Sequence, residues 1–366
     1  MPELRAPDVD AKPVETLLGP PLTDELNLVD ALGAKGYHDE VPLWQFAAWA
    51  ETTGLFGCLA GPASLSLGDI VARTALTEPG ADALVGVLVA TGLIERRGDR
   101  LLLAPLAREY LLPGSPFYRG EALYLTCREP LPAGFSKPGS GLDQGNGNVF
   151  SRLIARMLKR LRGWEYGGRR ILENQHVRNL PMATAAAHLE LFDEVECVVD
   201  IAGGTGTFSI PLAQRRPDAR IVLAELPAAL SGARRYLHRY GVSDRVELVG
   251  MDAFAPPWPV PECDVVFFGN FIHGWDDATC LALARNARAR LSPGGCIVWH
   301  ELLWNDQRDG PLKTALWNVT MRTVGGRQRQ LVELHGLLET AGFERLFAVP
   351  TSGGYFAVGG YRARQG

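Results

Sequence analysis

The segment Val198–Ser209, with the sequence VVDIAGGTGTFS, decides the fold that we expect for this chain. A run of apolar, strand-forming residues leads into a turn of closely spaced glycines, and the turn opens a stretch with helical spacing. Because glycine lacks a β-carbon, the backbone of such a turn can lie close to a ligand, and the free N–H groups at the start of the helix can bind a carboxylate. The segment therefore predicts a strand, a turn and a helix that suit an adenosine-linked anion.

The rest of the chain after this segment alternates between strand and helix signals, which predicts a parallel sheet with crossover helices. At the end of the chain, Arg345 to Pro350 and Tyr355 to Tyr361 flank the turn Thr351 to Gly354 and predict an antiparallel hairpin at the sheet edge. Nicotinamide dehydrogenases usually have sheets that are parallel throughout, so the hairpin disfavours that class. The expected strands are Cys197 to Ile201, Arg220 to Ala224, Val246 to Gly250, Cys263 to Phe268 and Cys296 to His300, and the expected helices are Phe208 to Arg216, Leu226 to Tyr240 and Ala278 to Leu291.

The N-terminal part of the chain is expected to be mainly helical. Apolar residues recur at three- and four-residue spacings in Leu43 to Leu59, Leu67 to Ala75 and Ala81 to Thr91. Two short extended segments around a turn at Arg97 to Asp99 follow, which gives the layout of a winged helix. Acidic residues outnumber basic ones in this stretch, so we expect dimerisation or a lid rather than DNA binding.

Four regions are expected along the chain. The Pro, Gly and Ser content of Glu129 to Asn148 predicts a linker or pocket-edge loop. The expected regions are a tail at 1–25, a winged-helix-like domain at 26–115, a linker with helices at 116–190 and an α/β domain at 191–366.

Composition and charge exclude several classes of protein. The 366 residues are enough for two folded units, and 37 Lys and Arg against 41 Asp and Glu give a net charge of −4 without blocks of like charge. Neither nucleic acid nor an anionic membrane surface is therefore expected as a main partner. No apolar run approaches the ~20 residues that span a bilayer, and Met1 to Pro20 lacks a secretory signal pattern, so we expect a cytoplasmic protein. The six cysteines form no C-x-x-C pair, which predicts neither a disulfide framework nor a metal site.

Two acidic positions follow the second and third expected strands. Glu225 lies about 19 residues after Gly206, where a carboxylate can accept hydrogen bonds from ribose hydroxyls. It could also be the acid at the start of a helix that begins at Leu226. Asp252 to Phe254 place a carboxylate and an apolar side chain where an adenine would lie, although Asp252 could equally cap a turn. Because a dinucleotide site would show similar glycines, an NAD-dependent oxidoreductase stays open at this point.

A further motif follows the fourth expected strand, where Phe267 to Asp277 read FFGNFIHGWDD, and Leu291 to Gly295 read LSPGG before the fifth strand. With the turn at Asp200 to Gly206, the order of these motifs resembles that of the class I small-molecule O-methyltransferases, typified by the plant caffeate and isoflavone enzymes and bacterial polyketide-tailoring relatives. The resemblance covers nearly the whole chain. It implies an α/β fold, with a Rossmann-like methyltransferase domain that ends in an antiparallel hairpin and follows a mainly helical winged-helix domain. It also implies a homodimer formed through the N-terminal domain.

The resemblance implies S-adenosylmethionine as cofactor, a small-molecule acceptor, and roles for individual residues. His273 would remove the proton of the acceptor hydroxyl, a task that suits an imidazole near neutral pH. Glu301, about 28 residues later, would orient His273 and stabilise the imidazolium. The residues expected to bind the cofactor are Asp200, Gly203, Gly204, Gly206, Glu225, Leu226, Asp252, Ala253, Phe254 and Asn270. The residues expected to contact the acceptor are Gln175, His176, Arg178, Trp275, Trp304, Trp317, Met321 and Gln328, of which Trp317 and Met321 could equally be core.

Three positions depart from the family pattern. Gln328 stands where the family has a second carboxylate, Gly269 where it has a basic residue, and Ala202 where it has a glycine. The first hypothesis is methyl transfer to the oxygen of a small aromatic or polyketide-like natural product. Carbon methylation of an activated ring or an α-keto acid, which requires less from the base, is the second hypothesis, ahead of an NAD-dependent oxidoreductase and a ligand-sensing winged-helix regulator. His300 neighbours Glu301 on the fifth strand, so it should point to the opposite face and be a buried, hydrogen-bonded histidine rather than a metal ligand.

Overall fold

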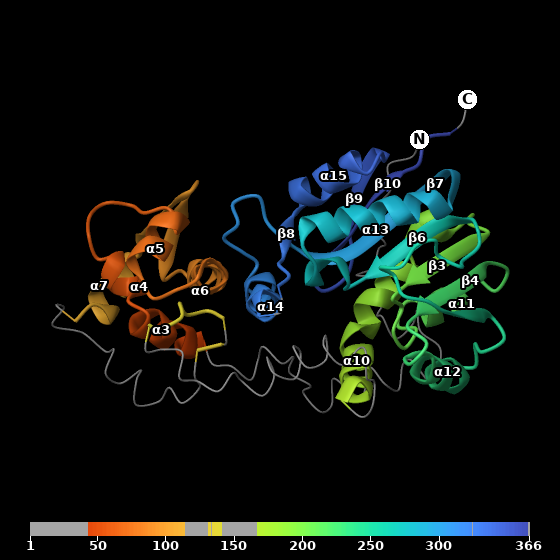
Figure 1. Cartoon of the computed structure of the whole chain (residues 1–366), viewed down its shortest axis with the longest axis horizontal. Helices are drawn as coiled ribbons and strands as arrows, with labels where there is room; N and C mark the ends of the chain where they lie inside the picture. The colour runs from red at the N-terminus through yellow and green to blue at the C-terminus, as the bar shows by residue number, and fades with distance from the viewer. Residues whose placement is uncertain (1–42, 114–130, 133, 141–166, 324, 365–366) are drawn as a thin grey trace. The chain divides into compact units, whose positions relative to one another are not determined.

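The computed structural model describes residues 43–113, 131–132, 134–140, 167–323 and 325–364 (Figure 1). These residues form two compact units. An α/β unit contains the described residues of 160–303 and 331–366, and a helical unit contains those of 35–159 and 304–330. The expected tail at 1–25 and most of the expected linker, including 141–148, lie outside the described residues. The segment Trp304–Gln330 belongs to the helical unit although it follows the fifth strand of the α/β unit in the sequence.

The sheet of the α/β unit is mainly parallel and closes with an antiparallel hairpin. Its strand order is β5-β4-β3-β6-β7-β10-β9. The pairs β3/β4, β4/β5, β3/β6 and β6/β7 are parallel, whereas β10 pairs antiparallel with both β7 and β9. The predicted α/β fold and its edge hairpin are therefore confirmed. The strands are β3 Cys197–Ile201, β4 Arg220–Glu225, β5 Val246–Gly250, β6 Cys263–Gly269, β7 Leu291–Trp304, β9 Glu344–Pro350 and β10 Tyr355–Tyr361.

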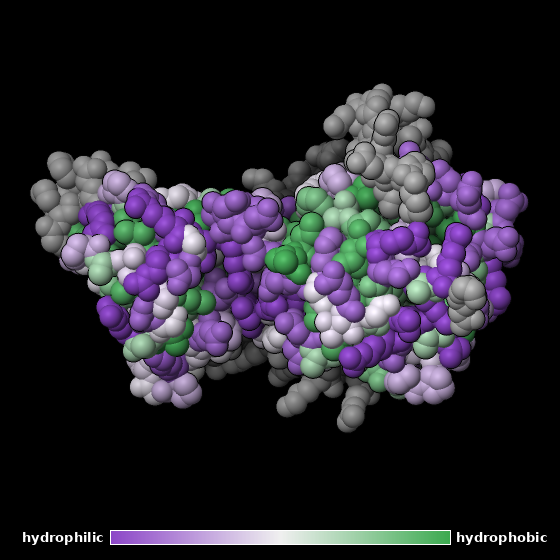
Figure 2. Space-filling model, turned by 90° about the horizontal axis from the view of Figure 1, so that it is seen from above, coloured by the Kyte–Doolittle hydropathy of each residue, from purple (hydrophilic) through white to green (hydrophobic). Residues whose placement is uncertain are grey.

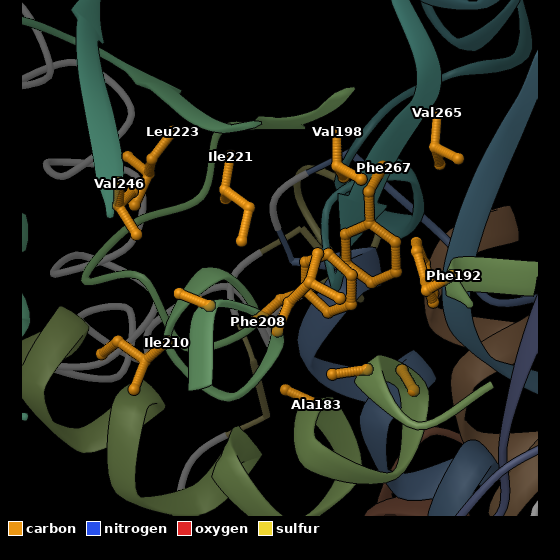
Figure 3. Close-up of a cluster of buried hydrophobic side chains, with 14 of the residues drawn as sticks. Ala183, Phe192, Val198, Phe208, Ile210, Ile221, Leu223, Val246, Val265 and Phe267 are labelled. Atoms are coloured by element: carbon orange, nitrogen blue, oxygen red, sulfur yellow. The ribbon is translucent and has the colours of Figure 1, made fainter. Parts of the chain in front are cut away.

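Helices cover both faces of this sheet (Figure 1). The central strands are apolar on both sides, so successive residues such as Val198 and Val199 belong to two different core clusters. Figure 3 shows the first cluster, in which the rings of Phe208 and Phe267 stack with their centroids 3.5 Å apart. The first cluster packs against α10, α11 and α12, and the second against α13 and α15. These elements are α10 Gly167–Ala187, the 3-10 turn η2 Glu190–Phe192, α11 Ser209–Arg215, α12 Leu230–Arg239, the 3-10 turn η3 Ile272–Gly274, α13 Asp277–Arg290 and α15 Leu331–Thr340.

Two predicted boundaries in the α/β unit are wrong. The helix expected from Leu226 begins only at Leu230, because Leu226–Ala229 form a separate turn in which the Ala229 N–H donates to the Leu226 carbonyl. The fifth strand was expected at Cys296 to His300, but β7 runs over Leu291–Trp304. The polar residues His300 and Glu301 were expected to mark the end of the apolar strand, but both are buried and lie within β7.

The helical unit contains short helices and the expected hairpin, in which β1 and β2 pair antiparallel. The helix expected over Leu43 to Leu59 is divided into α3 and α4 by Gly54, whose φ of 80° lies in the left-handed region that favours glycine. The side chain of Ser66 accepts a hydrogen bond from the Asp69 N–H in a capping box that starts α5, and Thr77 caps α6. The elements are α3 Leu43–Thr52, α4 Leu55–Cys58, α5 Leu67–Arg73, α6 Glu78–Ala90, β1 Ile94–Arg97, β2 Arg100–Leu103, α7 Pro105–Leu111, α14 Leu312–Arg322 and β8 Arg329–Gln330.

A buried charge cluster joins α14 to α6 in this unit. Asp82 on α6 is 7% exposed and accepts hydrogen bonds from Asn318 Nδ2 at 3.0 Å, Arg322 Nε at 2.8 Å and an Arg308 guanidinium nitrogen at 3.0 Å. Burial alone would raise the pKa of Asp82, but the charges of Arg308 and Arg322 outweigh it, so the pKa lies below its ordinary value. The segment Trp304–Gln330 is therefore held to α6 by ionic contacts as well as by apolar packing.

We expect Asp82→Asn to lower the free energy of unfolding by about 3 kcal/mol, because the variant leaves two partly buried guanidinium groups without their counter-ion. Urea denaturation of parent and variant would measure the difference. Asp99→Asn in the exposed turn of the hairpin is the matched control and should stay within about 0.5 kcal/mol of the parent. Equal stability of the Asp82 variant and the control would show that the cluster does not hold the unit together.

The face of the molecule drawn in Figure 2 is mixed in character. Hydrophilic and hydrophobic residues are interspersed over this face. Among the described helices, none combines the length and apolar composition needed to cross a membrane.

Candidate active site

The backbone of the glycine turn between β3 and α11 adopts positive φ angles, which residues with a β-carbon rarely adopt. Gly204 and Gly206 have φ values of 59° and 86°, and Ala202 adopts a φ of 55° despite its β-carbon. A β-carbon at Gly203 would lie 2.7 Å from the Asp200 carboxylate and 2.8 Å from Leu223. A larger residue at position 203 would therefore displace the acid beneath the turn.

Two carboxylates, those of Glu225 and Asp200, accept hydrogen bonds from the glycine turn and from the first residue of α11. The Glu225 carboxylate, at the end of β4, accepts hydrogen bonds from the Gly204 N–H at 3.0 Å and the Leu226 N–H at 2.6 Å. The Asp200 carboxylate, at the end of β3, accepts one from the Ser209 hydroxyl at 2.7 Å. Since the helix begins at Leu230, Glu225 is not the acid at its first turn, and it supports the glycine turn instead. Burial raises the pKa of Glu225, partly offset by these backbone hydrogen bonds. Glu225 is only partly buried, and its carboxylate keeps lone pairs that can accept hydrogen bonds from a ligand.

We expect Asp200→Asn to become more stable relative to the parent as the pH rises, in the absence of ligand. Burial raises the pKa of Asp200 to about 7, the Glu225 charge adds to the shift, and the Ser209 hydrogen bond opposes it. An unfolded aspartate ionises near pH ~4, so between about pH 4 and 7 the folded chain binds more protons and the parent loses stability. The shift of roughly three units sets an upper limit of about 4 kcal/mol.

Urea denaturation at several pH values would measure this difference between parent and variant. The exposed Asp218, changed to Asn, is the control and should follow the parent at every pH. A stability difference between Asp200→Asn and the parent that does not change with pH would contradict the expectation.

An aromatic wall follows β5. Asp252 accepts a hydrogen bond from the Phe254 N–H at 2.9 Å, so it caps a turn, as its second sequence-based interpretation expected. Phe254 is 45% exposed, and its ring lies edge-on to Trp275 at 4.6 Å and beside Phe271 at 6.0 Å. Trp275 was expected among acceptor contacts, yet it lies against a residue expected to face the cofactor. The exposed ring of Phe254 offers a flat apolar surface to a planar ligand.

The turn η3 brings a histidine onto a buried glutamate. His273 Nδ1 lies 2.6 Å from Glu301 Oε2, while Glu301 Oε1 accepts hydrogen bonds from the N–H groups of Phe271 at 2.9 Å and Ile272 at 2.8 Å. His273 and Glu301 are 7% and 2% exposed. Burial alone would raise the pKa of Glu301, but its interaction with His273 and the two backbone hydrogen bonds hold the pKa below its ordinary value. A charged Glu301 requires Nδ1–H as donor, which leaves the lone pair of the neutral imidazole on Nε2.

The residues beside this pair differ in role. Asn270 adopts a φ of 53°, and its buried Oδ1 has no hydrogen-bond partner among the described residues. Such an atom suits a ligand donor. His300 is buried, and its Nε2 lies 2.8 Å from the Thr351 hydroxyl, so its expected place as a buried, hydrogen-bonded histidine is confirmed. Burial lowers its pKa to about 4.

Residues 171–344 match the family model of an O-methyltransferase domain. The chain is 26% identical over 334 residues to the 3-hydroxy-5-methyl-1-naphthoate 3-O-methyltransferase of Streptomyces sahachiroi, which covers 86% of this chain and 92% of the relative. It is 28% identical over 311 residues to the acetylserotonin O-methyltransferase of Mus musculus molossinus, with 77% and 76% covered.

One solved structure matches this chain over almost its whole length. The O-methyltransferase family 2 protein of Planctomyces limnophilus, in complex with apigenin, superimposes with a TM-score of 0.71 at 25% identity and covers 95% of this chain and 98% of its own. Residues 171–344 are therefore an O-methyltransferase domain.

The residues that the sequence assigned to this methyltransferase's acceptor pocket are divided between the two units. Gln175, His176 and Arg178 lie on α10, and the Arg178 side chain lies outside what the structure describes. In the helical unit, Trp304, Met321 and Gln328 are buried, and the Gln328 N–H donates to Asn318 Oδ1 at 2.9 Å. Trp317 lies on α14. Their contact with an acceptor stays a prediction.

Thr205, Ser209 and Phe271 contact residues of the candidate site but were not predicted from the sequence. Thr205 and Ser209 were passed over because a threonine or serine near a glycine turn carries no distinctive signal. Phe271 was passed over because an aromatic residue is common in a core. Among the described residues, no cluster of three or more His, Cys, Asp or Glu is arranged to hold a metal ion.

Proposed function

We propose that the enzyme transfers the methyl group of S-adenosylmethionine to a hydroxyl oxygen of a small aromatic or polyketide-like acceptor. The observation that carries the proposal is the buried contact of 2.6 Å between His273 Nδ1 and Glu301 Oε2 in an O-methyltransferase domain. The relatives named for acetylserotonin and for a hydroxynaphthoate, and the neighbour that holds apigenin, support an aromatic acceptor. They favour oxygen over carbon methylation and leave neither an NAD-dependent oxidoreductase nor a ligand-sensing regulator as a competing hypothesis.

The residues at the ends of the parallel strands fit this cofactor. The glycine turn offers close backbone approach, and Glu225 keeps further lone pairs for ribose hydroxyls. Asp252 and the exposed ring of Phe254 suit the adenine, while Asn270 Oδ1 offers an unused acceptor. The cofactor-binding residues that we propose are Asp200, Gly203, Gly204, Gly206, Glu225, Leu226, Asp252, Ala253, Phe254 and Asn270.

In the proposed mechanism His273 acts as general base. Its Nε2 accepts the proton of the acceptor hydroxyl, and the Glu301 carboxylate, hydrogen-bonded to Nδ1, stabilises the imidazolium that forms. Both side chains are nearly excluded from water, which strengthens this ion pair. The cofactor supplies an electrophilic methyl group on a sulfonium centre. The remaining contribution of the chain is to hold the acceptor oxygen in line with it.

We also propose that the enzyme is a cytoplasmic homodimer, formed through the winged-helix-like region at 26–115. The support is the resemblance of its motif order to dimeric methyltransferases with such a domain. Light scattering during size-exclusion chromatography would measure the mass. A mass near 80 kDa, roughly twice the 39.8 kDa of one chain, supports the dimer, and the mass of one chain overturns it.

We expect Glu225→Ala to raise the Kd for S-adenosylhomocysteine by at least about tenfold, because the variant loses the ribose acceptor and a bond to Gly204. Isothermal titration calorimetry would measure it. Glu247→Ala is the matched control, since Glu247 lies exposed on the next strand and pairs with Arg220. If both variants bind like the parent, Glu225 is not the ribose acceptor.

Transfer of a labelled methyl group to a panel of hydroxyarenes tests the proposed function. Each acceptor is paired with the analogue that lacks the hydroxyl, and NMR of the product locates the new methyl. Methoxy products from the hydroxylated member alone support the proposal. Methylated carbon in the product, or no transfer to any member, contradicts it.

A further inference from the structure

A buried histidine on α10 contacts the glycine turn from the side. His176 is 0% exposed, and its Nδ1 lies 2.8 Å from the Thr205 hydroxyl and 3.4 Å from the Thr207 hydroxyl. The hydroxyls of Thr205 and Thr207 lie 3.3 Å apart. One imidazole nitrogen thus faces the two threonines of the sequence GGTGT.

The other side of the imidazole is anchored to α12 and its C-cap. His176 Nε2 lies 3.2 Å from the hydroxyl of Tyr240, the C-cap residue that follows α12. The ring also packs at a tilt of 36° against Tyr236, with centroids 4.0 Å apart, and stacks on Tyr240 with centroids 5.6 Å apart. The imidazole therefore links three segments that are distant in sequence, namely α10, the glycine turn and α12.

His176 stays neutral, so its two hydrogen-bonded contacts do not change with pH in the neutral range. Burial lowers the pKa of His176 to about 3, and the charge of Arg239 adds to the effect. A neutral imidazole has one N–H donor and one acceptor, and both hydroxyl partners can take either role. The link therefore does not titrate between about pH 5 and 9 and cannot serve as a proton carrier in that range.

We propose that His176 is a positioning residue for the cofactor, holding the Thr205 side of the glycine turn through Nδ1 while Tyr236 and Tyr240 fix its ring. The inference rests on the proposed function, because that function makes the turn the cofactor site. His176 then acts through Thr205 rather than by contact with the acceptor, which replaces its sequence-based assignment. Loss of the Nδ1 contact should loosen the turn and weaken cofactor binding, whereas loss of the Nε2 contact should chiefly lower stability.

Two amide substitutions separate the two nitrogens. The amide of Asn lies where Nδ1 lies, so His176→Asn keeps a partner for Thr205 and loses Tyr240. The amide of Gln reaches the position of Nε2, so His176→Gln does the reverse. Thr205→Val removes the hydroxyl that His176 Nδ1 contacts. His188→Gln is the control, because His188 follows α10 and bonds to the Thr184 carbonyl at 2.8 Å.

The test measures the Kd for S-adenosylhomocysteine by calorimetry, together with the Tm of each ligand-free variant. We expect His176→Gln and Thr205→Val to raise Kd about tenfold, with His176→Asn within about threefold and His188→Gln unchanged. Equal Kd values for the Asn and Gln variants at equal Tm, or a Thr205→Val variant that binds like the parent, would overturn the inference while the proposed function stands. A parent protein that does not bind the nucleoside would overturn both.

Discussion

His273→Ala should lower kcat by about 10³-fold while the Kd for S-adenosylhomocysteine stays within about twofold. The variant removes the imidazole that accepts the acceptor proton, and leaves the glycine turn and Glu225 in place. Steady-state rates with a hydroxyarene acceptor and calorimetry with the product nucleoside would measure the two effects separately.

His238→Ala is the control for this variant, because His238 is an exposed histidine on α12. It should match the parent in both measurements. An acceptor with a more acidic hydroxyl should recover part of the lost rate in His273→Ala, since it needs less help from a base. Unchanged turnover in His273→Ala would remove the base assignment.

Glu301→Gln should lower kcat by about 10³-fold, because it changes the tautomer of His273. The turn η3 should keep its structure. Glu301 Oε1 accepts hydrogen bonds from the Phe271 and Ile272 N–H groups, so the oxygen of a glutamine must stay there. Its NH₂ group then faces His273 Nδ1, which has to act as acceptor. The proton moves to Nε2, and the nitrogen that should accept the acceptor proton already carries one.

Glu301→Asp is the comparison variant, because it keeps the charge and shortens the side chain by one methylene. It should lose less activity than Glu301→Gln, and the Tm of the Gln variant should stay close to that of the parent. If the Gln variant retains most of the kcat of the parent, Glu301 does not set the tautomer of His273.

The α/β fold was predictable because its strands and turns carry local signals. The central strands are apolar on both faces, and their carboxyl ends carry the glycine turn, Glu225 and Asp252, which parallel pairing brings to one edge. His273 and Glu301 could be paired only through resemblance, since they lie about 28 residues apart on different elements.

Other features depend on tertiary contacts that leave no local signal. The membership of Trp304–Gln330 in the helical unit rests on contacts such as Asp82 with Arg322, which are 240 positions apart. The length of β7 depends on pairing with both β6 and β10. The double role of Glu301 and the place of His176 beside Thr205 follow from side-chain geometry, which spacing in the sequence does not determine.

Calorimetric titration of the purified protein with S-adenosylhomocysteine, and in parallel with NAD, tests whether the chain binds the nucleoside of a methyltransferase. We expect saturable binding of one S-adenosylhomocysteine per chain and no binding of NAD. A titration without heat for S-adenosylhomocysteine at several temperatures, or tighter binding of NAD, would contradict this expectation.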